Sequence, residues 1–169
     1  MTGSGSGRGR KLKPGRITFV GSGPGDPGLL TTRARTVLAN ATCVFTDPDV
    51  PTAVLSVVGS ALGPAVGPAP APSANVDGAD PAATTTPVGP DIRPALGEPA
   101  EVAKTLVAEA KAGADVVRLV AGDPLSVDSV ITEVNAVSRT SLAFDIVPGL
   151  PATVAVPTYA GLPLGSTHT

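Results

Sequence analysis

Three short runs of β-branched and aliphatic residues each end in a loop rich in glycine and proline, and this repetition constrains the fold more than any other feature. The runs cover residues 17–20, 115–120 and 144–147, and the loops that follow them cover 21–27, 121–124 and 148–151. A helical pattern follows each loop, so each unit is a strand, a turn and a helix. The carboxyl ends of parallel strands meet at one edge of an open α/β sheet, where ligands bind. We therefore expect the three loops to form one cleft.

The composition favours an α/β fold with a buried parallel sheet. Hydrophobic residues make up 42% of the 169 residues, but there are only three Phe, one Tyr and no Trp. A core of Val, Leu, Ile and Ala is typical of parallel strands beneath alanine-rich helices. The predicted elements are strands at 17–20, 42–46, 115–120 and 144–147, and helices at 27–40, 52–58, 99–113, 126–138 and 152–160. We expect a mostly parallel sheet of four or five strands with helices on both faces.

The chain divides into one folded body and segments of low complexity. Residues 1–15 are expected to be a disordered basic tail, followed by a single α/β domain at 16–165. Within that domain, residues 61–90 consist mainly of Ala, Pro, Gly, Ser and Thr, too little apolar surface to offset the entropy of ordering, so we expect a long loop. Residues 166–169 are expected to start a linker to a further domain. Pro157 should kink or shorten the last helix.

Charge and rare residues exclude several classes of function. Only seven of the 12 basic residues follow residue 16, together with all 14 acidic residues, so the body is acidic and unsuited to nucleic acid. Cys43, the sole cysteine, is expected to be a core residue, and with His168 as the sole histidine we expect no metal site. There is no signal peptide and no apolar stretch long enough to span a membrane, so we expect a cytoplasmic protein.

The first loop could also be a phosphate cradle. Its glycines match the dinucleotide-binding spacing: Gly23, Gly25 and Gly28. A cradle needs free backbone N–H groups, however, and Pro24 and Pro27 have none. Asp26 also places a carboxylate where the phosphate would lie. We therefore expect Asp26 to cap a helix that begins with Pro27, and a turn without any ligand remains an alternative.

The first loop resembles the Gly-x-Gly-Pro-Gly-Asp-Pro opening of the tetrapyrrole methylases. Three later segments resemble, in the same order, that family's Gly-Gly-Asp-Pro, Val-Pro-Gly and Ala-Pro-x-Tyr-Ala-Gly-Ile-Pro-Leu motifs: residues 116–124, 144–149 and 155–164. The chain is most similar to uroporphyrinogen-III C-methyltransferases, some of which are fused to uroporphyrinogen-III synthase. The resemblance covers 17–58 and 91–167 and implies the N-terminal α/β domain of such an enzyme, about half of it.

The resemblance implies a homodimeric methyltransferase that uses S-adenosylmethionine to convert uroporphyrinogen III to precorrin-2, on the route to sirohaem and cobalamin. Carried over from the family's motifs, the cofactor-binding positions are Pro24, Ala121, Gly122, Asp123, Ser126, Pro151 and Ala152. Asp47 aligns with the family's proton acceptor, and a carboxylate can take the proton that the attacking carbon must lose. Each acid also has a structural interpretation: Asp47 as a turn residue before Pro48, and Asp123 as a helix start.

The chain departs from the family's pattern at several positions. The family's Gly-Lys-Arg segment, whose lysine is assigned as the proton donor, falls near Ala69, and no lysine occurs between Lys13 and Lys104. Ala121 replaces a glycine, and Pro151 replaces a residue with a hydroxyl group. One alternative is therefore a catalytically eroded binding or scaffold domain attached to a uroporphyrinogen-III synthase. Another is an enzyme of the same architecture with a different donor cofactor. We expect the chain alone to be inactive.

Overall fold

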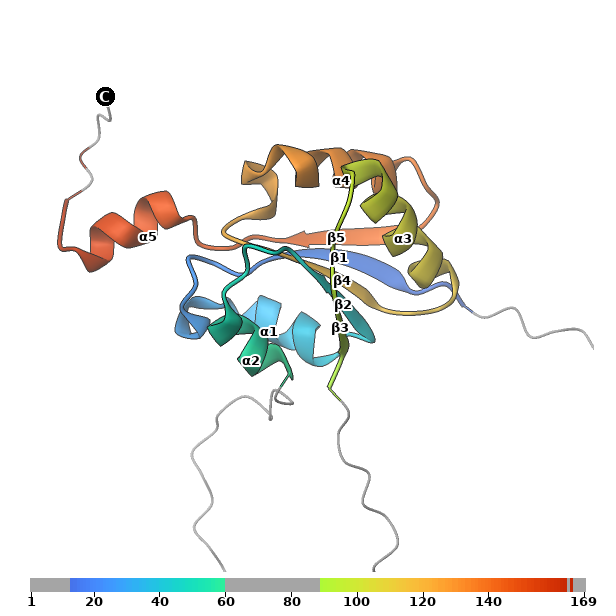
Figure 1. Cartoon of the computed structure of the whole chain (residues 1–169), viewed down its shortest axis with the longest axis horizontal. Helices are drawn as coiled ribbons and strands as arrows, with labels where there is room; N and C mark the ends of the chain where they lie inside the picture. Colours follow the sequence, from blue (N-terminus) through green and yellow to red (C-terminus); the bar gives the residue numbers. More distant parts are fainter. Residues whose placement is uncertain (1–12, 60–88, 164, 166–169) are drawn as a thin grey trace, which may run out of the picture.

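The computed structural model describes residues 13–59, 89–163 and 165, and within them five strands form one parallel sheet. The strands are β1 (Arg16–Gly21), β2 (Cys43–Thr46), β3 (Asp91–Pro94), β4 (Val116–Val120) and β5 (Ala143–Val147). Their order across the sheet is β3-β2-β4-β1-β5. Helices α1 (Thr32–Ala39) and α2 (Thr52–Gly59) cover one face, and α3 (Pro99–Lys111) and α4 (Asp128–Ser138) cover the other (Figure 1). The predicted fold is confirmed.

Two hydrophobic cores lie on opposite sides of the sheet, because successive side chains of a strand point to opposite faces. Ile17 and Phe19 pack with residues of α3 and α4, whereas Val20 packs with residues of α1 and α2. The central strands are therefore buried on both faces, as their continuous apolar runs predict. The prediction for Cys43 is also confirmed: it is 3% exposed and belongs to the core on the α3 side. Its burial, together with the charge of Glu109, raises the pKa of its thiol.

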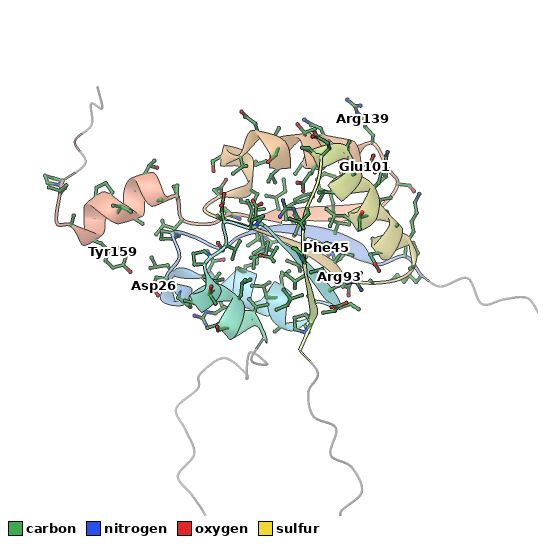
Figure 2. All side chains as sticks on the ribbon, viewed as in Figure 1. Asp26, Phe45, Arg93, Glu101, Arg139 and Tyr159 are labelled. Carbon is green, nitrogen blue, oxygen red and sulfur yellow. The ribbon has the colours of Figure 1, made fainter. Side chains whose placement is uncertain are left out.

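One strand was not predicted. The segment that forms β3 has two charged residues and a proline, so its sequence carries no strand pattern. It lies at the edge of the sheet and pairs only with β2. Pro94 has no N–H to donate, and an edge strand tolerates this loss. The guanidinium of Arg93 also lies 5.7 Å from the centre of the Phe45 ring, which helps to fasten the strand to β2 (Figure 2).

Two predicted helices begin later than expected. The helix predicted at 27–40 starts as a 3₁₀ turn, Pro27–Leu29, and α1 begins only at Thr32. The hydroxyl oxygen of Thr31 accepts the N–H of Ala34 at 3.1 Å and so caps α1 separately. The helix predicted at 126–138 likewise starts with a 3₁₀ turn, Pro124–Ser126, before α4. Each turn begins at the proline of an Asp-Pro pair, and the aspartate caps the turn rather than a longer helix.

The predicted tail (1–15), loop (61–90) and linker (166–169) lie outside the described residues except at their borders. Gly15, at the border of the tail, donates its N–H to the carbonyl oxygen of Ala110 at 2.8 Å. The position near Ala69, where the family's lysine would fall, is also outside the described residues. In the part of the chain that is described, no helix combines the length and apolar character needed to cross a membrane.

Helix α5 (Ala152–Tyr159) lies beyond the end of β5 rather than over either face of the sheet (Figure 1). It runs through Pro157 and ends at Tyr159, one residue before the predicted end. Ala155 is buried. Most of the large apolar side chains in this segment are exposed: Val154, Val156, Tyr159 and Leu162. The segment therefore presents an apolar surface next to the carboxyl edge of the sheet.

Candidate functional site

The loops after β1, β4 and β5 meet through backbone contacts between glycines. Gly23 and Gly122 exchange two backbone hydrogen bonds, at 3.2 and 3.0 Å. A Cβ atom on Gly21 would lie 2.5 Å from both the carbonyl oxygen of Gly122 and the nitrogen of Gly149, so a side chain has no room there. We call this contact of Gly21, Gly122 and Gly149 the glycine junction. The predicted convergence of the three loops at one edge of the sheet is confirmed.

Asp123 ties two of these loops together through its carboxylate. One oxygen, Oδ1, accepts the N–H of Leu125 at 3.0 Å, and the other, Oδ2, accepts the N–H of Gly149 at 3.1 Å. The hydroxyl of Ser126 donates to the carbonyl oxygen of Asp123 at 2.7 Å. The helix-start interpretation of Asp123 is thus correct, and the same side chain also fixes the loop after β5. Its predicted role in binding a cofactor stays a prediction.

Asp26 caps the first loop, as predicted. Its Oδ1 accepts the N–H of Gly28 at 2.7 Å, with Pro27 in the first position of the turn. This N–H is therefore engaged, which disfavours the phosphate cradle. The other carboxylate oxygen, Oδ2, accepts the hydroxyl of Tyr159 at 3.1 Å. Figure 2 shows Tyr159 pointing from α5 toward Asp26, so this bond connects α5 to the first loop.

The bond between Tyr159 and Asp26 gives a pH-dependent prediction. The hydrogen bond to Asp26, with a smaller contribution from burial, raises the pKa of Tyr159. The folded protein then holds this proton more tightly than the unfolded chain. The contribution of the bond to stability is complete below the ordinary tyrosine pKa of about 10, and it is lost as the pH rises through the folded value.

Ultraviolet absorbance reports this titration directly, because Tyr159 is the only tyrosine. We expect a midpoint above about 10 in the folded protein and a lower midpoint in Asp26→Asn. Glu101→Gln, a change on the exposed surface of α3, is the matched control and should not move the midpoint. Equal midpoints in the wild type and Asp26→Asn would show that the bond does not form in solution.

Asp47 follows β2 at the same edge of the sheet. Its N–H donates to the carbonyl oxygen of Leu119 in β4 at 2.9 Å, and its side chain is 21% exposed. The loop that follows β2 reaches the first loop, since a Cβ on Gly25 would lie 3.0 Å from the Pro51 ring. The carboxylate is therefore at the surface, next to the three loops. A carboxylate in this place is accessible to a substrate.

The sequence analysis did not identify Arg118, which lies beside Asp47. Arg118 belongs to β4, and its Nη2 is 3.7 Å from Oδ1 of Asp47. This distance is an ion-pair contact rather than a hydrogen bond, whereas two hydrogen bonds join Arg118 to Glu133 of α4, at 2.8 and 3.1 Å. One signal was available in the sequence: a charged residue within the apolar run Val-Val-Arg-Leu-Val must have a partner if the strand is buried.

The other predicted site residues lie along the same edge. Pro24 lies in the first loop, directly after Gly23, which hydrogen-bonds to Gly122. Ala121 lies between β4 and Gly122 of the glycine junction. Pro151 precedes α5 as its N-cap residue, and Ala152 is the first residue of that helix. Ser126 is exposed at the end of its turn. The structure thus gathers the predicted residues around four strand ends.

A hollow of about 360 Å³ lies elsewhere, near the amino-terminal ends of β1 and β4 and beside α1. Its charged lining residues are Arg16, Arg33, Asp115 and Asp145. Arg33 forms an ion pair with Asp145, and Asp115 accepts the N–H of Arg16 at 3.3 Å. We place the candidate site instead at the carboxyl edge of the sheet, where ligands bind in open α/β folds and where Asp47 and the glycine junction lie.

Comparison with known proteins identifies the family. Residues 16–169 match the family described as Tetrapyrrole (Corrin/Porphyrin) Methylases. The chain is 34% identical over 150 residues to the S-adenosyl-L-methionine-dependent uroporphyrinogen III methyltransferase of Methanosarcina barkeri, a match that covers 89% of this chain and 51% of the relative.

Solved structures of the uroporphyrin-III C-methyltransferase from Thermus thermophilus have the same fold. One of them is 27% identical with a TM-score of 0.67, and it covers 91% of this chain and 55% of that chain. Another, complexed with S-adenyl homocysteine, is 28% identical with a TM-score of 0.64 and covers 92% and 54%. The chain therefore spans about half the length of the relatives it matches.

Proposed function

The chain belongs to the tetrapyrrole methylase family, and we propose that it forms the S-adenosylmethionine-binding half of an enzyme that methylates uroporphyrinogen III. The observation that carries this proposal is the glycine junction with Asp47 beside it. A Cβ on Gly122 would meet no atom within 4 Å, so the backbone there faces open space. A nucleoside can approach such a backbone closely. The cofactor and substrate classes come from the names of the relatives.

The residues at this edge fit a cofactor without phosphate groups. The first loop carries two prolines and a carboxylate engaged in capping, which disfavours an anionic ligand. We assign the binding of the nucleoside and its methionine moiety to Pro24, Ala121, Gly122, Asp123, Ser126, Pro151 and Ala152. For Asp123 this role would be indirect, because both of its carboxylate oxygens hold backbone N–H groups of neighbouring loops.

S-adenosylmethionine, when bound, supplies an already activated methyl group. The protein then has two tasks: to align the pyrrole carbon with that methyl group, and to accept the proton that this carbon loses. Asp47 is suited to the second task because its carboxylate is accessible and lies 3.7 Å from the cationic Nη2 of Arg118. We propose that the glycine junction serves the alignment of the pyrrole carbon with the methyl group, because it fixes the three loops relative to one another. The proposed product is precorrin-2, and the proposed assembly is a homodimer with a second domain closing the site.

A binding or scaffold domain is the second candidate function. It is favoured by the absence of any lysine between Lys13 and Lys104, where the family has its proton donor. Such a domain would keep the cofactor site but not the turnover. Binding and catalysis must therefore be measured separately.

Calorimetric titration with S-adenosylhomocysteine tests the cofactor proposal. We expect micromolar binding to the full-length gene product and weaker binding to residues 1–169 alone, because half of the site would be missing. The matched control is Glu101→Gln, which lies on the exposed surface of α3 and should bind equally well. The absence of heat at millimolar ligand in the full-length product would refute the proposal.

Asp47→Asn tests the base. The substitution keeps the shape of the side chain but removes its ability to accept a proton, so we expect methylation of uroporphyrinogen III to fall by about 100-fold or more. Affinity for S-adenosylhomocysteine should stay unchanged. Unchanged turnover would remove Asp47 from the mechanism, and binding without turnover in the wild type would favour the scaffold function.

A further inference from the structure

A buried ion pair between Arg118 and Glu133 lies beside Asp47. The side chains of Arg118 and Glu133 are only 3% and 2% exposed, although one comes from a central strand and the other from α4. Their two hydrogen bonds form the parallel, two-pronged arrangement that fixes a guanidinium most firmly. The plane of the Arg118 guanidinium is therefore set by Glu133.

Stability alone is a weak reason for such a pair. Apolar side chains of similar size usually stabilise a core as well as a buried ion pair does, because burying two charges removes them from water. The apolar surroundings here are well suited to such a replacement, since Val130, Val134 and Val120 belong to the same core. The pair thus calls for a second role.

The contacts of the Arg118 guanidinium indicate this second role. Nε and Nη2 donate to Glu133, and Nη1 donates to the carbonyl oxygen of Leu119 at 3.2 Å. Nη2 has a second hydrogen, and Oδ1 of Asp47 lies 3.7 Å away. Asp47 is the one member of this group that reaches the surface, at 21% exposure. The guanidinium of Arg118, with its orientation set by Glu133, therefore faces the carboxylate of Asp47 at the edge of the sheet.

We propose that Arg118, held by Glu133, is a positioning residue that fixes the carboxylate of Asp47 at the carboxyl edge of the sheet. The catalytic consequence rests on the proposed function, in which Asp47 accepts a proton. Arg118 acts through Asp47 and does not itself touch the substrate. Glu133 holds the Arg118 guanidinium in a fixed position, so the guanidinium does not move with the carboxylate of Asp47.

The first experiment follows the Asp47 carboxyl carbon by nuclear magnetic resonance in protein labelled at its aspartate carboxyl groups. The signal is assigned by its loss in Asp47→Asn. The test variant is R118M/E133M, which removes both buried charges together and so avoids leaving one unpaired. We expect the Asp47 signal to move in this variant and to stay in place in E101Q/K104M, which removes an exposed pair on α3. An unchanged signal in R118M/E133M would overturn the proposal.

R118K provides the same measurement if R118M/E133M does not fold. Lysine keeps the charge but lacks the planar fork, so the two-pronged contact with Glu133 is lost. We expect the Asp47 signal to move in R118K as well. A folded R118K variant with an unchanged signal would show that the orientation of the guanidinium does not matter for Asp47, against the proposal.

The second experiment measures methylation of uroporphyrinogen III by the full-length gene product. We expect R118M/E133M to lower kcat by about 10- to 100-fold through misplacement of the base, with the KM for S-adenosylmethionine within about twofold of the wild type. In an Asp47→Asn background, the same double change should lower kcat no further, because the two act as one unit. Additive losses would assign Arg118 a role independent of Asp47.

The two experiments separate this inference from the proposed function. Failure to bind S-adenosylhomocysteine, or unchanged turnover in Asp47→Asn, would refute the function, while the carboxyl signal would still decide whether Arg118 holds Asp47. A moved signal with unchanged kcat would overturn the catalytic part of the inference alone.

Discussion

Arg118→Met is expected to lower the free energy of unfolding by about 3–5 kcal/mol, more than any other single change considered for this chain. The substitution removes the partner of Glu133, whose side chain is only 2% exposed. The carboxylate would then be a buried charge without an opposite charge, or it would have to take up a proton. Methionine has nearly the length of the aliphatic part of arginine, so the loss arises from charge more than from packing.

Urea denaturation of Arg118→Met beside R118M/E133M measures this loss. The double variant removes both charges, so we expect it to recover most of the lost stability even though it carries one more substitution. Lys104→Met breaks an exposed pair with Glu101 and is expected to change stability by less than about 1 kcal/mol. If the double variant were less stable than Arg118→Met, the loss would come from packing rather than from an unpaired charge.

The fold could be predicted from the sequence wherever an element carries its own local signal. The apolar runs that form β1 and β4 are buried in the sheet, and a shorter apolar run forms β5 at its edge. A Gly/Pro loop marks the end of each of the three strands. The strand β3 has no such signal, because Asp91–Pro94 becomes a strand only by pairing with β2. The two 3₁₀ turns were missed for a related reason: an Asp-Pro pair indicates that a helix begins but not how long it continues.

In the candidate site, too, local contacts could be predicted from the sequence, whereas contacts between distant elements could not. Asp26 could be identified as a cap because its partner, Gly28, is two residues away. The pair Arg118–Glu133 could not be predicted, because its members are 15 residues apart on a strand and a helix and meet only after α4 packs on the sheet. Asp123 shows that one motif can serve two interpretations. The same residue that resembles a cofactor ligand also caps a turn and holds Gly149.

Gly149→Ala is expected to lower the free energy of unfolding by about 2–4 kcal/mol and to weaken binding of S-adenosylhomocysteine at the same time. A Cβ atom at this position would overlap the carbonyl oxygen of Gly122 and would lie 2.9 Å from the backbone of Gly21. The obstructing atoms are all backbone, so no side chain can rotate away to make room. The loops after β1, β4 and β5 would have to move apart, and the proposed cofactor site is built from those loops.

Two other glycines are compared with Gly149: Gly165 is the matched control in denaturation and calorimetry, and Gly122 is compared in denaturation alone. A Cβ on Gly165 would meet nothing within 4 Å, so Gly165→Ala should leave stability and binding unchanged. Gly122→Ala also has free space, but its φ of +69° is unfavourable for alanine, and we expect a loss of about 1 kcal/mol. If Gly149→Ala behaved like Gly165→Ala, the glycine junction would not hold the loops together, and the cofactor site would need another support. A large loss confined to Gly149→Ala would instead show that contact between the loops, rather than the conformation of a single glycine, maintains this edge of the sheet.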